Sequence, residues 1–207
     1  MAQSPSDTSA ARRQPVQQRS QERMDRILSA AEQLIEQKGS DQVKMSEVAQ
    51  LADISIGSLY QYFPDKRAVI RTLAAQYAVG SRQCIADALA PVRDKAELLA
   101  AFSGLVDQYY EIFQGKPVRR DIISGMRADK ELQALELAES KACGVLLAAA
   151  IRRVFPKADP KKIGPLAFLV WQLGEETMRL ALAHRRSEGQ AIVEAYKRMS
   201  LRAIAEP

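Results

Sequence analysis

The 207-residue chain has few of the residues on which most catalytic and metal sites depend. It contains one histidine, His184, and two cysteines, Cys84 and Cys143, which have neither metal-ligand spacing nor the pattern of a disulfide framework. Gly-rich phosphate loops and Cys/His pairs are also missing, so we expect no metal, no cofactor and no enzymatic activity. Isolated thiols are typical of a reducing compartment, so we expect a cytoplasmic location.

Long hydrophobic runs are missing as well. The longest run, 145–151, has seven residues and 166–171 has six, whereas a membrane-spanning helix needs about 20. The first residues carry no apolar stretch, so we expect no secretory signal. The hydrophobic fraction is nevertheless 47%, which is too high for a disordered chain and predicts a buried core.

Turn-forming and β-branched hydroxyl residues are scarce, whereas helix-forming residues are abundant. The chain has 3 Thr, 10 Gly and 9 Pro against 32 Ala and 20 Leu, which favours an all-α fold. Apolar periodicity, caps and prolines predict about nine helices, at approximately 20–39, 45–52, 56–62, 64–89, 94–114, 119–127, 130–155, 163–184 and 187–204. We expect three parts: a disordered basic tail (1–19), a helix-turn-helix domain (20–66) and a helical domain for ligand binding and dimerisation (67–207).

The most specific pattern lies between Lys44 and Lys66. Two short helices joined by a tight connection predict a helix-turn-helix, whose second helix enters the major groove of DNA. In that second helix Ser55 is a suitable N-cap, and Leu59 and Phe63 would face the core. The side chains left outside are those of Ser58, Tyr60, Gln61 and Tyr62. Gln61 has the amide geometry for bidentate recognition of adenine, and Lys66 can pair with a phosphate.

Three runs of this segment, 45–49, 52–55 and 57–66, resemble the DNA-binding domain of the TetR family of bacterial transcriptional regulators, over about 23–77. The run Gly-Ser-Leu-Tyr-Gln-Tyr-Phe-Pro-Asp-Lys is highly specific. The resemblance implies phosphate contacts by Ser58, Tyr60, Tyr62 and Lys66, and base reading by Gln61. The predicted DNA-binding residues are Lys44, Ser46, Ser55, Ile56, Ser58, Tyr60, Gln61, Tyr62 and Lys66.

Two positions depart from the family pattern. Ile56 replaces a common polar residue, which would make its contact apolar, for instance with a thymine methyl group. Lys44 replaces a common Thr N-cap. That change either shifts capping to Ser46 or adds a phosphate contact.

The resemblance further implies that the rest of the chain dimerises and binds a small effector. Aromatic, soft apolar and acidic side chains on presumed inner helices are the candidate pocket residues: Phe102, Tyr109, Tyr110, Phe113, Trp171, Glu175 and Met178. Glu175 and Glu176 interrupt an apolar helix, so one of them would meet a cationic ligand or pair with Arg127 or Arg179. The alternatives are core packing for the aromatic residues and a solvent position for a glutamate.

We therefore expect a homodimeric repressor that a small molecule releases from a pseudo-palindromic operator. The last two helices should form the dimer interface, because 166–173 is apolar almost all round and 192–201 carries an apolar stripe. Two alternatives stay open. One is a DNA-binding regulator without an effector, which thermal stabilisation by ligands would distinguish. The other is a small helical enzyme that uses carboxylates alone.

Net charge gives little support to a nucleic-acid partner. Of the total of +5, residues 1–80 contribute 10 basic and 9 acidic side chains, a net of +1. The local placement is more informative, because the stretch 8–21 has no acid and contains Arg12, Arg13 and Arg19. These arginines form either a minor-groove arm or a solvated end, and the same choice between DNA contact and solvated charge applies to Arg23 and Arg26.

Overall fold

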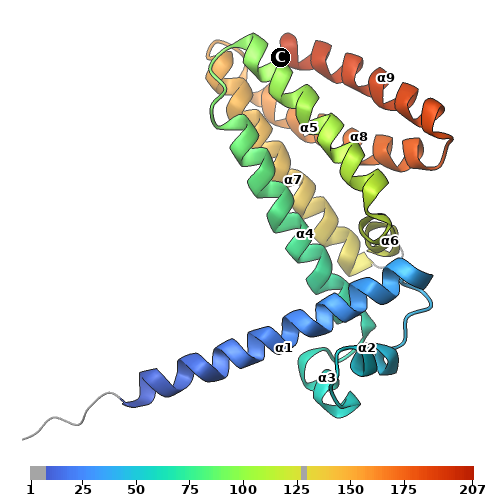
Figure 1. The fold of residues 1–207 in the computed structure, drawn as a ribbon. Helices are drawn as coiled ribbons and strands as arrows, with labels where there is room; N and C mark the ends of the chain where they lie inside the picture. The colour runs from blue at the N-terminus through green and yellow to red at the C-terminus, as the bar shows by residue number, and fades with distance from the viewer. Residues whose placement is uncertain (1–7, 127–129) are drawn as a thin grey trace, which may run out of the picture. The chain divides into compact units, whose positions relative to one another are not determined.

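The protein is described here by a computed structural model that covers residues 8–126 and 130–207, with side chains from Gln18 onward except Ser124 and Gly125. These residues form nine helices and no strand, which confirms the all-α expectation (Figure 1). The helices are α1 (Thr8–Lys38), α2 (Met45–Leu51), α3 (Ile56–Tyr62), α4 (Lys66–Leu89), α5 (Lys95–Gly115), α6 (Pro117–Met126), α7 (Lys130–Val154), α8 (Pro160–Leu182) and α9 (Arg186–Ala205). No helix in the described part is long and apolar enough to cross a membrane.

The chain divides into two compact units, Met1–Leu73 and Ala74–Pro207, so α4 belongs partly to each. The sequence predicts that the first domain ends at Lys66. Its boundary lies further along because Val69, Ile70 and Leu73 at the start of α4 are buried. Two of these, Val69 and Ile70, line a small space together with residues of α1 and α2. The first two turns of α4 are therefore part of the core of the N-terminal unit.

Helix α1 is longer than the sequence pattern predicts. It begins at Thr8 rather than at Ser20, so Ser20 lies inside the helix and is not its N-cap. The prediction of a disordered tail over 1–19 is wrong for 8–19, and residues 1–7 lie outside the described part. The extra turns are rich in Ala, Arg and Gln, which have high helix propensity but give no apolar periodicity. The predicted end of the helix is correct, since Gly39 follows it with φ of 85°.

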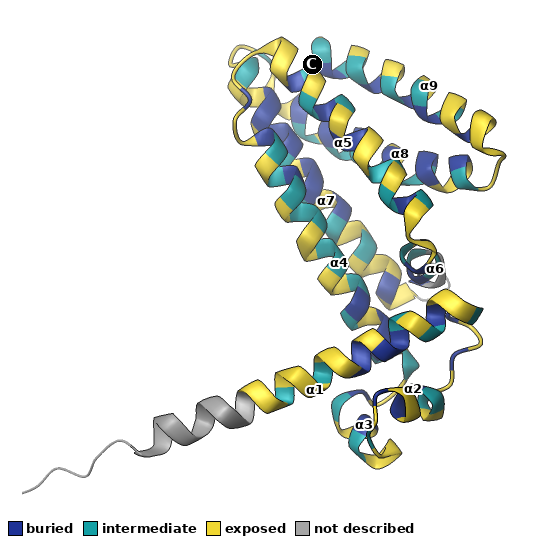
Figure 2. Cartoon of the chain, in the orientation of Figure 1, coloured by how far each residue is buried: buried dark blue, intermediate teal, exposed yellow. Residues whose placement is uncertain are grey.

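The helices of the C-terminal unit share one hydrophobic core, whose buried residues are dark blue in Figure 2. Gly144 of α7 lies against the backbone of α8, where an added Cβ would come within 3.0 Å of Phe168 Cα. Arg153 near the end of α7 donates to the carbonyl oxygens of Leu89 and Val92, which fastens the C-terminal end of α4. Helix α8 begins at Pro160 with Asp159 as its N-cap, three residues before its expected start.

Candidate DNA-binding surface and effector cavity

The connection between α2 and α3 is built from local side-chain chemistry. Asp53 adopts φ of 55°, a left-handed conformation that short polar side chains tolerate better than most. Ser55 Oγ then accepts the backbone N–H of Ser58 at 3.2 Å, as its predicted role of N-cap requires. Leu59 has an exposed fraction of 0% and Phe63 is also buried. The two predicted core residues thus hold α3 against the unit and fix which side faces outward.

The outward side of α3 presents large side chains that the fold itself does not bury. Ile56 is 42% exposed and Tyr60 is 50% exposed, and Gln61 is exposed as well. Ser58 and Tyr62 are half-buried along the edge of this face. Ile56 is therefore an exposed apolar side chain at the position for which the sequence predicts an apolar contact with DNA.

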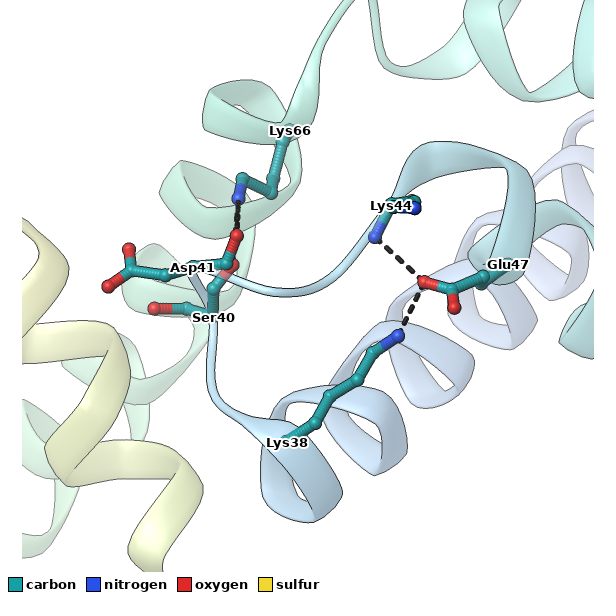
Figure 3. A network of polar contacts seen from close by, with 6 residues as sticks. All are labelled: Lys38, Ser40, Asp41, Lys44, Glu47 and Lys66. Atoms are coloured by element: carbon teal, nitrogen blue, oxygen red, sulfur yellow. Dashed lines mark hydrogen bonds and ion pairs between the residues drawn. The ribbon is translucent and has the colours of Figure 1, made fainter.

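The predicted shift of the N-cap of α2 to Ser46 is wrong, because the helix begins at Met45 and Ser46 lies inside it. Lys44 is the N-cap residue but its side chain makes no capping hydrogen bond. Glu47 Oε2 instead accepts the backbone N–H of Lys44 at 3.0 Å and an N–H of Lys38 Nζ at 2.5 Å (Figure 3). These two bonds, led by the one from Lys38, lower the pKa of Glu47. The Lys44 and Ser46 side chains are exposed and remain available for DNA.

Lys66 has an internal role that the sequence did not reveal. Its Nζ donates to the carbonyl oxygens of Ser40 at 2.8 Å and Asp41 at 3.0 Å, in the loop between α1 and α2 (Figure 3). These bonds join the start of α4 to that loop, so Lys66 helps to position α3, which lies between them in the chain. An ammonium has three donors, and a phosphate contact would use the third.

The two adjacent glutamates of α8 have different hydrogen-bond partners. Glu176 Oε2 accepts from Arg179 Nε at 2.9 Å, which is the pairing predicted for one member of the pair. Glu175 Oε2 accepts from the buried Ser140 Oγ of α7 at 2.8 Å. Arg127, the other predicted partner, lies outside the described residues. Glu175 is thus the glutamate that faces the interior of the C-terminal unit.

A cavity of about 30 Å³ lies between α5, α8 and α9. Five of the seven predicted pocket residues line it together with four that the sequence reasoning missed: Phe102, Leu105, Val106, Tyr109, Trp171, Gly174, Glu175, Met178 and Tyr196. Apart from Glu175 the lining side chains are aromatic or apolar. The volume suits one or two water molecules, whereas sites for drug-sized ligands are roughly 300–1,000 Å³. A larger ligand would therefore have to move the helices apart.

Two predicted pocket residues lie elsewhere. The Phe113 ring packs against the Tyr109 ring, with centroids 4.6 Å apart, and does not line the cavity. The Tyr110 hydroxyl reaches Gly189 at the start of α9, where an added Cβ would come within 2.9 Å of it. Tyr110, Phe113 and Tyr109 share one helix, and periodicity alone does not say which ring points to a neighbouring helix and which to a cavity.

Both tyrosines of the cavity stay protonated at neutral pH. Burial, and secondarily the Glu175 carboxylate, raises the pKa of Tyr109 far above its ordinary value. Burial raises the pKa of Tyr196 to about 12, and its hydroxyl donates to the Val170 carbonyl oxygen at 2.6 Å. The cavity consequently combines neutral phenol groups with a single carboxylate.

The single histidine and the basic side chains around the loop between α7 and α8 lie away from the cavity. His184 is exposed after the end of α8, with Nδ1 2.8 Å from the Leu180 carbonyl oxygen. Within the described residues there is no group of three or more His, Cys, Asp or Glu side chains arranged to hold a metal ion. Of the basic side chains around the loop between α7 and α8, Arg153 binds backbone carbonyls, while Arg152, Lys157, Lys161 and Lys162 are exposed.

Comparison with known proteins agrees with this division into two units. Residues 27–73 match the family model described as "Bacterial regulatory proteins, tetR family". Residues 96–206, more than half of the chain, match the model described as "Tetracyclin repressor-like, C-terminal domain". A curated relative, the HTH-type transcriptional repressor KstR of Rhodococcus jostii, is 40% identical over 57 residues, which is 27% of each chain.

Solved structures resemble the chain over most of its length. A TetR-family transcriptional regulator from Mesorhizobium loti has a TM-score of 0.66 at 18% identity, with 88% of this chain and 96% of that chain covered. Thermus thermophilus FadR, a TetR-family repressor in complex with lauroyl-CoA, has a TM-score of 0.64 at 21% identity, with 88% and 93% covered. These likenesses show the fold. Together with the matched family models, they establish that the chain belongs to the TetR family of DNA-binding transcriptional regulators.

Proposed function

We propose that the protein is a homodimeric, cytoplasmic repressor that binds a pseudo-palindromic operator and is released from it by a small molecule. The observation that carries DNA recognition is the outward side of α3. There Ile56, Tyr60 and Gln61 are exposed on a short helix whose opposite side is buried in the unit. Phosphate contacts by Ser58, Tyr62 and Lys66, and further contacts by Lys44, Ser46 and Ser55, complete the proposed surface.

Dimerisation is proposed because one short helix reads few base pairs, and two half-sites about 34–36 Å apart multiply specificity. Helices α8 and α9 supply the surface. Leu169, Leu173 and Leu180 are exposed along one side of α8, and Met199 of α9 is 56% exposed. Exposed apolar side chains at helical spacing are typical of a helix–helix interface.

We propose that the effector enters the cavity beside Glu175. The lining favours an apolar or aromatic body with a protonated amine, because a carboxylate among aromatic side chains attracts a cation and repels an anion. Since the cavity is small, the effector would select a conformation in which α5 and α8 are further apart. The lauroyl-CoA complex of the Thermus relative supports effector binding by this fold, though not this effector chemistry.

The two alternative functions, a regulator without an effector and a small helical enzyme, make different predictions for this cavity. A regulator without an effector would share the α3 surface and show no thermal stabilisation by any amine. An enzyme that uses carboxylates alone would need a second acid beside Glu175, and no other carboxylate lines the described cavity. We therefore propose regulation rather than catalysis, without a metal or cofactor.

Base reading is tested by replacing Gln61 with alanine. Gln61→Ala is expected to relax the preference at one base pair of each half-site by about 1–3 kcal/mol, because the bidentate amide is removed. Tyr60→Phe is the matched comparison, and it should weaken binding to all sequences alike. Both are measured as dissociation constants for the operator and for each single-base variant. A Gln61→Ala effect that is equal for every sequence would contradict base reading.

Effector coupling is tested by measuring operator affinity with and without a ligand. Hydrophobic amines and matched carboxylic acids are first screened by thermal shift, and amines are expected to stabilise the protein. A stabilising amine should lower operator affinity about 5–150-fold, since a coupling free energy of about 1–3 kcal/mol is typical. Glu175→Gln retains the shape of the side chain and removes its charge, so it should abolish the preference for amines. Unchanged operator affinity at saturating ligand would refute the coupling.

A further inference from the structure

Arg119, near the start of α6, is a half-buried guanidinium that no carboxylate neutralises within the described part of the protein. Its Cζ lies over the Tyr77 ring of α4, 4.6 Å from the centroid, and its Nη2 donates to the Tyr77 carbonyl oxygen at 3.3 Å. A guanidinium carries five donors, and this one bond is longer than most N–H···O bonds. Arg119 therefore retains most of its capacity to bind an acceptor, above all an anionic one.

Tyr109 connects Arg119 to the effector cavity. Its ring lines that cavity, and the ring of Phe113, one turn further along α5, packs against it. Helix α6 follows directly at the end of α5 (Figure 1). Beyond the effect of burial, the Glu175 carboxylate raises the pKa of Tyr109 and the Arg119 guanidinium opposes that rise. The Tyr109 hydroxyl is thus within range of both charges, one from α8 and one from α6.

The two opposite charges at this site are held by different contacts. Glu175 Oε2 accepts from Ser140 Oγ of α7 at 2.8 Å. Arg119 instead contacts Tyr77 of α4, so the two charges do not neutralise each other. The rest of the cavity lining is aromatic or apolar. An acidic and a basic group that act on one mostly apolar site without pairing are complementary to a molecule that carries both opposite charges.

We propose that Arg119 binds a carboxylate of the effector, so that the effector is an amphoteric molecule with an apolar or aromatic body, a protonated amine beside Glu175 and a carboxylate on Arg119. The inference rests on the proposed function, because it assumes that the cavity beside Glu175 receives an amine. The planar guanidinium fork holds the carboxylate by two parallel hydrogen bonds. Glu175 disfavours a simple carboxylic acid, so the carboxylate is recognised only in a molecule that also supplies the amine.

The test uses phenylalkylamines of increasing chain length as probes. Each is compared with the same amine carrying a para carboxylate and with the methyl ester of that acid, which has nearly the same shape but no negative charge. Dissociation constants are measured by isothermal titration with the full chain and no DNA. The variants are Arg119→Gln, Arg119→Lys and Arg120→Gln. Arg120 supplies the matched control, because it is the exposed neighbour of Arg119 on α6 and carries the same charge.

Wild type is expected to bind the carboxylated amine of at least one chain length about 10–100-fold more tightly than its ester, the effect of a hydrogen-bonded charge pair. Arg119→Gln should remove this difference and leave the affinity for the plain amine unchanged. Arg119→Lys should retain part of the difference, since an ammonium keeps the charge but loses the bidentate geometry. Arg120→Gln should bind all the probes as wild type does.

Equal affinity of wild type for acid and ester at every chain length would overturn the proposal. So would an undiminished difference in Arg119→Gln or an equal loss in Arg120→Gln. Thermal unfolding without ligand controls for folding. If the glutamine variant is unstable, Arg119→Lys decides, because an undiminished difference there contradicts the bidentate contact. Failure of every plain amine to bind would refute the proposed effector site and this inference with it, whereas amine binding without a gain from the carboxylate would refute this inference alone.

Discussion

Leu169→Glu is expected to convert the protein to a monomer at micromolar concentration and to weaken operator binding by roughly 100-fold or more. Leu169 is 55% exposed on the outer side of α8, where the proposed interface would bury it. A carboxylate buried without a partner costs several kcal/mol, and a two-fold interface contains the substitution twice. A penalty of about 4 kcal/mol already weakens dimerisation a thousandfold.

Leu137→Glu is the matched control, because Leu137 of α7 is 53% exposed and lies outside the proposed interface. It should remain dimeric and bind the operator as wild type does. Sedimentation velocity gives the oligomeric state, and titration of the operator gives the affinity. Dimerisation through α8 and α9 would be wrong if Leu169→Glu stayed dimeric, or if the wild-type chain were monomeric at micromolar concentration.

The second large effect is expected at Gly189, where α9 begins against the end of α8. A Cβ at this position would lie 2.3 Å from the Ala181 carbonyl oxygen, a contact with backbone that no rotamer change relieves. Gly189→Ala must therefore move α9 away from α8, which disturbs the buried side chains of Val193 and Tyr196. We expect the unfolding free energy to fall by about 3 kcal/mol, at the upper end for overpacked sites.

Gly104→Ala is the control for the change in helix propensity. Gly104 lies within α5 and an added Cβ would meet nothing within 4 Å, so this variant should gain about 0.5–1 kcal/mol. Urea unfolding at one fixed protein concentration measures both, because dimerisation makes apparent stability depend on concentration. A Gly189→Ala variant within about 1 kcal/mol of wild type would show that the start of α9 is not closely packed in solution.

The helix-turn-helix could be predicted almost residue by residue, because its determinants are local. Ser55 caps α3 and Leu59 and Phe63 face the core, as predicted, and these assignments need only residues within the same short helix and its flanks. The start of α1 could not be predicted in this way. Its first turns lack an apolar stripe, so periodicity contained no signal there, and only the helix propensity of Ala, Arg and Gln favoured helix.

For the cavity residues too, the sequence predicts the residue types, whereas only the structure shows their contacts. The sequence identified an acidic pair and a set of aromatic residues, but not which side chains each of them contacts. Glu175 and Glu176 are adjacent, and only the packing of α8 on α7 decides that Glu175 accepts from Ser140 while Glu176 pairs with Arg179. Tyr196 also lines the cavity. Its position there could not be predicted, because α9 is distant in sequence from α5 and the apolar spacing within α9 does not show which helix it packs against.

By itself, the amino-acid sequence determined the all-α class, the turn chemistry of α2 and α3, and the side of α3 that faces outward, because neighbouring residues govern all three. Only the tertiary structure decided that Lys66 binds loop carbonyls, that Ser20 of α1 lies within hydrogen-bonding distance of Tyr62, and that a cavity lies between α5, α8 and α9. These features join residues 26 to 90 or more positions apart. Their contacts depend on the packing of whole helices, which the local pattern of residues does not encode.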